Sequence, residues 1–250
     1  MTLYEYPCNE RVRILLRLEC LFDRLFFFAQ GEDARHHQVA MGTLFDILEC
    51  LDRTDIKGSV MQDLDRQRQA LLVLRGHASV DQVGLEKTLA DIEQAIAALA
   101  SQGKIGQALR DNDWLTSLRG RLSVPGGATQ FDMPSYYAWQ QKPIEQRRAS
   151  LRDWVAVILP VFQSLSLCLR LLRQSGSMAD AEAAQGAYQH MLGGKVQQLV
   201  RVHVDEELGV FPEISANKYM IWIRFSCQDG EMKPQQVMRT IPFRIALCSF

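Results

Sequence analysis

Arginines in a predicted first helix are the residues whose type and spacing best suit a chemical role. Arg13, Arg17 and Arg24 fall on one side of a helix that we expect to begin at the N-cap Asn9 and to run to about Phe28. The planar guanidinium matches the two oxygens of a carboxylate, so this stripe could bind an acidic partner. The alternative is a solvated helix face, which the general exposure of charged residues favours by roughly three to one.

A second group of arginines lies further along the chain, in a stretch rich in aromatic residues. The group comprises Arg110, Arg119 and Arg121, beside Trp114, Tyr136, Tyr137 and Trp139. Arginine mixed with tyrosine and tryptophan is the composition of protein-binding hot spots. The same composition could form a closing layer between two domains, in which case the stretch 110–139 is an interdomain joint. The pattern leaves both alternatives open.

Catalytic and metal-binding motifs give a weaker signal than the arginines. The five histidines are His36, His37, His77, His190 and His203, and none has a partner at a recognised catalytic or ligand spacing. The six cysteines include no CxxC pair, which indicates thiols in a reducing compartment. Phosphate-binding loops and nucleophile elbows are missing as well. These motifs give no support to an enzyme, although catalytic residues need not be contiguous, and we expect no cofactor and no metal.

The composition is that of a soluble globular protein without a global electrostatic bias. The chain has 250 residues, of which 47% are hydrophobic and 23% charged, and its formal net charge is -1. A nucleic-acid-binding protein usually shows a basic excess, so the composition argues against that class. The run 154–172 has the length of a membrane span, but it carries a polar stripe at i, i+3, i+7 and i+10 from Gln163. We therefore expect an amphipathic helix, no membrane insertion and a cytoplasmic protein.

Amphipathic periods predict successive helices in the first half of the chain. The expected ranges are 9–28, 34–52, 59–75, 81–101 and 105–118. Short connections between such helices imply an antiparallel bundle. After the last of them, the sequence Val-Pro-Gly-Gly from Val124 to Gly127 suits a type II turn, which needs a positive φ at its third residue.

The rest of the chain combines helix with strand. Pro134 is expected to open a short helical turn, and residues 144–174 form one long helix or two joined at Pro160. Residues 176–194 lack a bulky apolar stripe and are predicted to be a mobile loop. Alternating apolar and polar residues predict strands near 199–204, 219–225 and 243–247, with weaker strand signals at 2–6, 121–124, 130–131 and Phe211.

These elements predict an α+β fold with two domains. An N-terminal antiparallel helical bundle occupies residues 8–118, and helix 144–174 could join it. A C-terminal antiparallel β-sandwich-like domain with one long helix occupies residues 119–250. The N-terminal strand 2–6 could complete this second domain.

Four segments of the sequence resemble one known family. They are YEYPCNERVRILLRLE (4–19), IGQALR (105–110), LRGRLSVPGGATQFDMPSYYAW (118–139) and VFPEISANK (210–218). In this order along the whole chain they resemble the ZapD family of Z-ring-associated bacterial cell-division proteins. The RLSxPGG…FDxP pattern is the specific part of the resemblance.

The resemblance implies a function as well as a fold. Members of this family have a helical domain and a β-rich domain, and as homodimers they bind the C-terminal tail of FtsZ, the tubulin-like division GTPase. By doing so they cross-link and bundle FtsZ filaments. Arg13 and Arg17 match the basic pair of the family's first helix. Arg110, Arg119 and Arg121 match basic residues that family members carry around the corresponding joint.

Two positions depart from the family pattern. Family members can have a basic residue where this chain has Asp113, and a histidine where it has Tyr137. The expected partner-binding residues are Arg13, Arg17, Arg24, Arg110, Arg119, Arg121 and Tyr137.

The leading interpretation is a non-enzymatic adaptor at the division site that promotes assembly and stability of the Z-ring. Its expected partners are the FtsZ tail and a second copy of itself. The alternatives are a small α+β enzyme and a nucleic-acid-binding protein that uses the same arginines.

Overall fold

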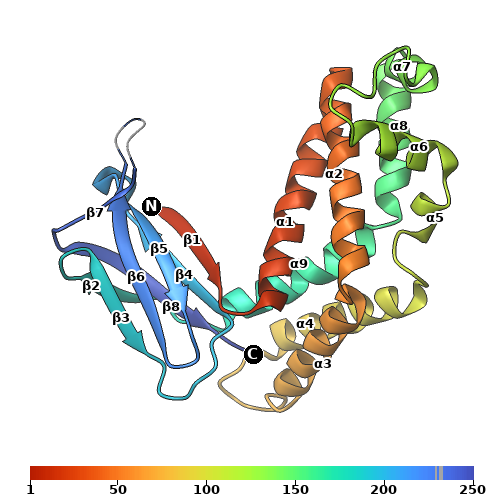
Figure 1. The fold of residues 1–250 in the computed structure, drawn as a ribbon. Helices are drawn as coiled ribbons and strands as arrows, with labels where there is room; N and C mark the ends of the chain where they lie inside the picture. The colour runs from red at the N-terminus through yellow and green to blue at the C-terminus, as the bar shows by residue number, and fades with distance from the viewer. Residues whose placement is uncertain (229, 231–232) are drawn as a thin grey trace. The chain divides into compact units, whose positions relative to one another are not determined.

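Two compact units make up the chain. The computed structural model describes residues 1–228, 230 and 233–250. Contacts group Arg17–Cys168 into a helical unit, and Met1–Leu16 with Leu169–Phe250 into a β unit. Figure 1 shows the order of the helices and strands along the chain. Residues 119–168 thus belong with the helices, whereas the sequence predicts a domain boundary after residue 118.

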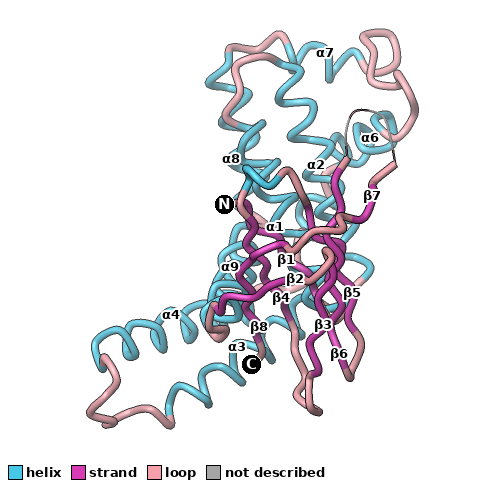
Figure 2. The backbone as a smooth tube through the Cα atoms, turned by 90° about the vertical axis from the view of Figure 1, so that its left-hand side faces the viewer, coloured by secondary structure: helices cyan, strands magenta, loops and turns pink. Residues whose placement is uncertain are grey.

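Four long helices follow the first strand, and each begins at a side-chain cap. They are α1 (Glu10–Ala29), α2 (Ala34–Arg53), α3 (Ile56–Leu72) and α4 (Gln82–Ser101). Their N-cap residues are Asn9, Asp33, Asp55 and Asp81, whose side-chain oxygens accept hydrogen bonds from backbone N–H groups of the first turn. The helices α3 and α4 lie side by side as a hairpin (Figure 2). The four long helices predicted from the amphipathic periods are confirmed.

The predicted helix 105–118 is wrong as a single element. It is divided into α5 (Gln107–Arg110) and α6 (Asp113–Leu122). Asn112 is the physical reason, because its Oδ1 accepts a hydrogen bond from the N–H of Leu115 at 3.0 Å and so caps a new helix. The strand signals at 121–124 and 130–131 are also wrong, since these residues end α6 and form turns.

The turn after α6 and the short helix beyond it are confirmed. Gly126 has φ of 72°, and the N–H of Gly127 donates to the carbonyl of Val124 at 2.8 Å, as in a type II turn. The helix α7 (Pro134–Gln140) has proline at its first position, where the missing N–H costs no intrahelical bond.

The segment 144–174 forms two helices rather than one. They are α8 (Ile144–Ala156) and α9 (Leu159–Gln174), bent by 62° at their junction. Pro160 lies in the first turn of α9, where it is tolerated. In one continuous helix its ring would clash with the carbonyl of Ala156, which is the last residue of α8. No single helix in the described part of the chain is long and apolar enough to cross a membrane, although the bent pair passes by length and composition.

The β unit consists of two antiparallel sheets. The first contains β1 (Thr2–Pro7), β4 (Leu199–Val204), β8 (Ile241–Cys248) and β2 (Ala179–Ala183), in that order across the sheet. The second contains β3 (Ala187–Met191), β6 (Met220–Cys227) and β5 (Phe211–Ala216), with β7 (Gln235–Gln236) also paired to β6. A short 3₁₀ turn, Glu206–Leu208, follows β4. The strands predicted near residues 2–6, 199–204, 211, 219–225 and 243–247 are confirmed.

Alternate residues of the two sheets share one apolar core. Val200, Val202 and Val204 of β4 are at most 1% exposed, and Ile221, Ile223 and Phe225 of β6 are equally buried. This period of two is the pattern of strands with one buried face. The α+β fold, with helices first and a β-sandwich later in the chain, is confirmed.

The mobile loop predicted at 176–194 is wrong, because most of it forms a hairpin whose two strands diverge from a tight turn, one pairing into each sheet. Its strands are β2 and β3, and Gln185 and Gly186 form the turn with φ of 52° and 70°. The apolar residues of β2 are all alanines, and Ala183 is fully buried in the core. A search for bulky apolar residues therefore misses this strand.

Candidate functional site

An acidic row along α2 organises most of the predicted arginines of the helical unit. We define the α2 acidic row as Asp46, Glu49 and Asp52, which lie on one side of the helix at i, i+3 and i+6. Arg24 of α1 donates from Nη2 to Asp46 Oδ2 at 2.6 Å and from Nε to Thr43 Oγ1 at 2.9 Å. Both charged side chains remain about half exposed, so this ion pair is open to exchange with solvent or a partner.

Arg110 is held more firmly than any other predicted arginine of the helical unit. Its side chain is only 15% exposed, and it contacts both oxygens of Asp52, with Nη2 at 2.8 Å from Oδ1 and Nε at 3.2 Å from Oδ2. It also donates to the backbone carbonyls of Ile105 and Leu48. This geometry ties α5 to α2 and leaves little of the guanidinium for a partner.

Arg119 shares a carboxylate with another arginine. Its Nη2 lies 3.6 Å from Glu49 Oε2, which is longer than a hydrogen bond, while Arg53 donates to the other oxygen of Glu49. The Arg119 side chain is 39% exposed. Arg119 and Arg121 lie in the last turn of α6, where the helix dipole favours positive charge.

Arg17 is exposed on the α1 face that carries Arg24. Its charge acts on the thiol of Cys50, which lies in α2 next to Glu49. Burial raises the pKa of the Cys50 thiol, and the charges of Asp46 and Glu49 raise it further, whereas Arg53 and Arg17 lower it. Arg17 therefore lies within electrostatic reach of the α2 acidic row.

Arg121 and Tyr137 are exposed residues near the type II turn and on α7. No carboxylate in the described part of the chain forms an ion pair with Arg121, which lies at the end of α6. The Tyr137 side chain is 44% exposed. Both side chains are thus accessible from solvent.

Arg13 belongs to the β unit, although it lies in the same helix as Arg17. Its Nε lies 3.2 Å from Glu10 Oε2, and the guanidinium is 5.8 Å from the centre of the Tyr6 ring. The side chain is 36% exposed. Arg13 is partly engaged by its own unit but is not sealed inside it.

Three aromatic residues of the second group, Trp114, Tyr136 and Trp139, form a packing layer within the helical unit together with Trp154. The rings of Trp114, Tyr136, Trp139 and Trp154 lie against one another, with centroids 5.7–6.3 Å apart for neighbouring pairs. Tyr136 is fully buried, and this burial raises the pKa of its hydroxyl to about 12. The unit boundaries fall at residues 16 and 168, so the stretch 110–139 is not an interdomain joint.

Histidine and cysteine side chains form no metal site in the described residues. His37 is fully buried and its Nε2 lies 2.8 Å from the carbonyl oxygen of Gly31, while the neighbouring His36 points to solvent. All six cysteines are described, and no two of them form a disulfide.

Sequence reasoning missed the acidic half of the site. Asp46, Glu49 and Asp52 decide which arginines are engaged, and Arg53 competes for one of these carboxylates. The signal was present as carboxylates spaced at i, i+3 and i+6 in the helix 34–52. Which arginines they meet depends on packing between helices that are distant in sequence.

The fold and the site define a class: an α+β protein with an arginine-bearing helical unit and a β-sandwich. The chain matches the ZapD family, described as cell division protein, over residues 16–224. The cell division protein ZapD of Bordetella pertussis is 64% identical over 247 residues, which cover 99% of this chain and 98% of that relative. The protein of the same name from Bordetella petrii is 61% identical over 249 residues and is covered completely. The chain belongs to the ZapD family of cell division proteins.

Proposed function

We propose that this protein is a non-enzymatic adaptor that binds the C-terminal tail of FtsZ and, as a homodimer, cross-links FtsZ filaments at the division site. Membership of a cell-division family supports the setting. The observation that carries the proposal is the group of exposed or weakly paired arginines on the helical unit. This tail-binding surface comprises Arg17, Arg24, Arg119 and Arg121, with Tyr137 as an accessible aromatic contact.

The weak internal pairing suits a site that exchanges its carboxylates. Exposed ion pairs contribute only about 0.2–1 kcal/mol each, so Arg24 and Arg119 can leave Asp46 and Glu49 at small cost. A flexible tail with carboxylates can take their place. Arg110 is excluded from this surface, because its side chain is only 15% exposed and is held by both oxygens of Asp52. Arg13 lies one turn before Arg17 in α1 but belongs to the β unit, so it is not counted in this surface.

A dimer with two tail-binding sites would bundle filaments, whereas a single site would only bind one tail modestly. A single tail that makes a few exposed ion pairs should bind weakly. A dimer that engages two tails of multivalent filaments gains roughly 10²–10⁴ in avidity without any new contact. A monomeric variant should therefore bind the tail but fail to bundle filaments.

The direct test is charge reversal on the tail-binding surface. Arg17→Glu and Arg121→Glu should each weaken binding of an FtsZ tail peptide by roughly fivefold, the equivalent of about 1 kcal/mol. Arg66→Glu is the matched control, since Arg66 is an equally exposed arginine on α3. Fluorescence anisotropy with a labelled tail peptide measures the binding, and circular dichroism checks that the helix content is unchanged.

Filament bundling provides the second arm of the test. Light scattering should rise when the protein is mixed with full-length FtsZ and should not rise with tail-deleted FtsZ. Equal scattering with both forms of FtsZ, or equal loss of tail binding in Arg66→Glu, would refute the proposed surface.

A further inference from the structure

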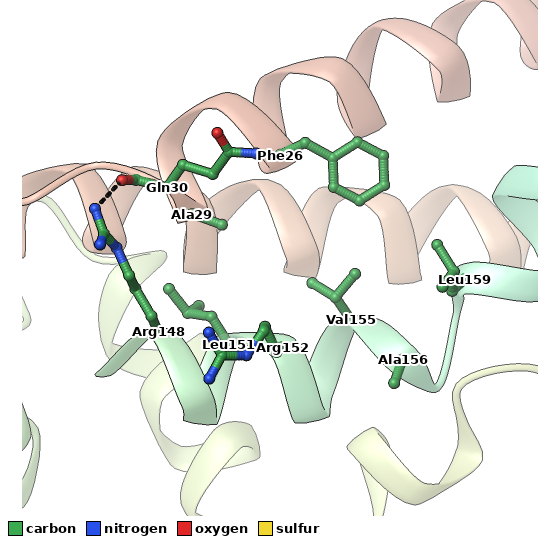
Figure 3. Close-up of a pocket in the computed structure, with 9 residues that line it drawn as sticks. All are labelled: Phe26, Ala29, Gln30, Arg148, Leu151, Arg152, Val155, Ala156 and Leu159. Atoms are coloured by element: carbon green, nitrogen blue, oxygen red, sulfur yellow. Dashed lines mark hydrogen bonds between the residues drawn. The ribbon is translucent and has the colours of Figure 1, made fainter. Parts of the chain in front are cut away.

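An apolar groove runs between α1 and α8 in the helical unit. Its volume is about 640 Å³, and nine residues line it, among them Phe26, Leu151, Val155 and Leu159 together with Arg148 and Arg152. Figure 3 shows Val155 pointing from α8 toward α1, with Arg148 at one end of the groove and Leu159 at the other. Cavities of this size hold several apolar side chains or a small ligand.

The apolar wall of the groove is well anchored. The ring of Phe26 lies 4.8 Å from that of Phe162 and 5.9 Å from that of Phe22, which is fully buried. Leu151 is 1% exposed. Side chains that are packed in this way need no reordering when a ligand arrives, which lowers the entropic cost of binding.

Arg148 and Arg152 give one end of the groove a positive charge. Arg148 donates to the carbonyl of Gln30, and its Nη1 lies 3.4 Å from the exposed Glu145, but its buried Nε finds no acceptor in the described residues. Arg152 is exposed and forms no ion pair with any described residue. No acidic residue is among the nine that line the groove. A carboxylate from outside can therefore pair with the exposed guanidinium of Arg152 at this end of the groove.

We propose that this groove is a second docking site, for a short segment of a partner protein that carries apolar side chains and an acidic residue at one end. The groove is open between two helices, as in the recognition of an amphipathic segment by a helical protein. Phe26 lies nine residues after Arg17, and at about 100° per residue the two face opposite sides of α1. The site is therefore separate from the proposed tail-binding surface and does not depend on it.

Selection from a random peptide display library tests this proposal on the full-length protein. Binders are counter-selected on Val155→Glu, and one selected peptide is synthesised and labelled for fluorescence polarisation. We expect enriched peptides to combine apolar residues with an acidic residue. Val155→Glu and Arg152→Glu should each weaken binding of the synthetic peptide roughly tenfold. Arg152 is exposed, so its variant keeps the test valid if Val155→Glu disturbs folding.

A charge swap makes the test specific. Arg152→Glu should regain affinity for a peptide in which the acidic residue is replaced by lysine, while the control Arg66→Glu should bind the original peptide normally. Enrichment of peptides without acidic residues, or no enrichment over the counter-selected pool, overturns the proposal. So does competition by the FtsZ tail peptide, or a change of oligomeric state in Val155→Glu, which would mean that a second copy covers the groove.

Discussion

The carboxylate of Glu49 contacts two arginines, Arg53 and Arg119. It therefore competes with a bound tail for Arg119 of the proposed tail-binding surface. Arg53 holds one of its oxygens, and Arg119 lies 3.6 Å from the other. Any incoming carboxylate must displace this interaction. The individual pair is weak, so the balance between internal and external carboxylates can be shifted by one substitution.

We predict that Glu49→Gln strengthens binding of the FtsZ tail. The change removes a competing charge and leaves Arg119 more available, so the affinity should rise by roughly two- to fivefold. Anisotropy with the labelled tail peptide measures it. Glu86→Gln is the matched control, because Glu86 forms an equally exposed ion pair with Arg75 away from the surface. Unchanged or weaker binding by Glu49→Gln would exclude Glu49 as a competitor.

The buried ring of His37 should make the stability of the protein depend on pH. Burial lowers the pKa of its ring below the usual 6.5, with Arg147 and Arg148 acting in the same direction. In the unfolded chain the ring has its usual pKa near 6.5. Below that pH the unfolded state therefore binds more protons than the folded state does. Stability should therefore fall as the pH is lowered from about 6.5 toward the folded pKa.

Urea unfolding followed by tryptophan fluorescence at pH 7.5 and pH 5.5 measures this effect. In His37→Gln the decrease in unfolding midpoint between the two pH values should be smaller than in the wild type. An identical decrease in both proteins would assign the acid sensitivity to other groups, such as His203, whose pKa is also lowered by burial.

At the scale of elements, the hairpin of β2 and β3 depends on its turn. Gln185 and Gly186 both have positive φ, which suits the two central positions of a type I′ turn, where Asn-Gly is preferred. A Cβ added to Gly186 would clash with the backbone carbonyl of Val237. The hairpin therefore requires glycine at this position and merely tolerates glutamine before it.

We predict opposite effects for two substitutions in this turn. Gly186→Ala should destabilise the protein by about 1–3 kcal/mol, because the positive φ and the clash act together. Gln185→Asn should be neutral or stabilise it by a few tenths of a kcal/mol. Gly103→Ala is the control, since an added Cβ there meets nothing within 4 Å and φ is not positive. Thermal unfolding compares the three, and an equal loss in Gly103→Ala would contradict the explanation.

At the scale of the whole molecule, bundling should be more sensitive to salt than the binding of one tail. The Debye length, over which charges interact, shortens from about 10 Å at 0.1 M to about 3 Å at 1 M ionic strength. Exposed ion pairs are therefore weaker at high salt. Each cross-link needs two such sites, so its loss combines two weakened interactions. Light scattering of filaments should therefore fall at lower salt than the anisotropy of a single labelled tail. Parallel salt curves for both measurements would contradict the two-site scheme.

Local patterns in the sequence determined the long helices, the Asn9 cap, the type II turn at Gly126 and the strands β4, β6 and β8. Each of these depends on residues close together in the chain, through periodicity, capping or turn geometry. The division of 105–118 at Asn112 and the strands at 179–191 were not predicted. A cap inside an apolar period and a strand whose apolar residues are alanines give weak local signals.

Only the tertiary structure decided which arginines are available to a partner. The sequence by itself determined that arginines are concentrated in two groups and, through its family resemblance, that the protein acts in cell division. It did not reveal that Arg110 is locked to Asp52, fifty-eight residues away, whereas Arg121 is left open. The reason is physical: an ion pair forms where packing brings two helices together, and that distance is not encoded in the spacing of either helix alone.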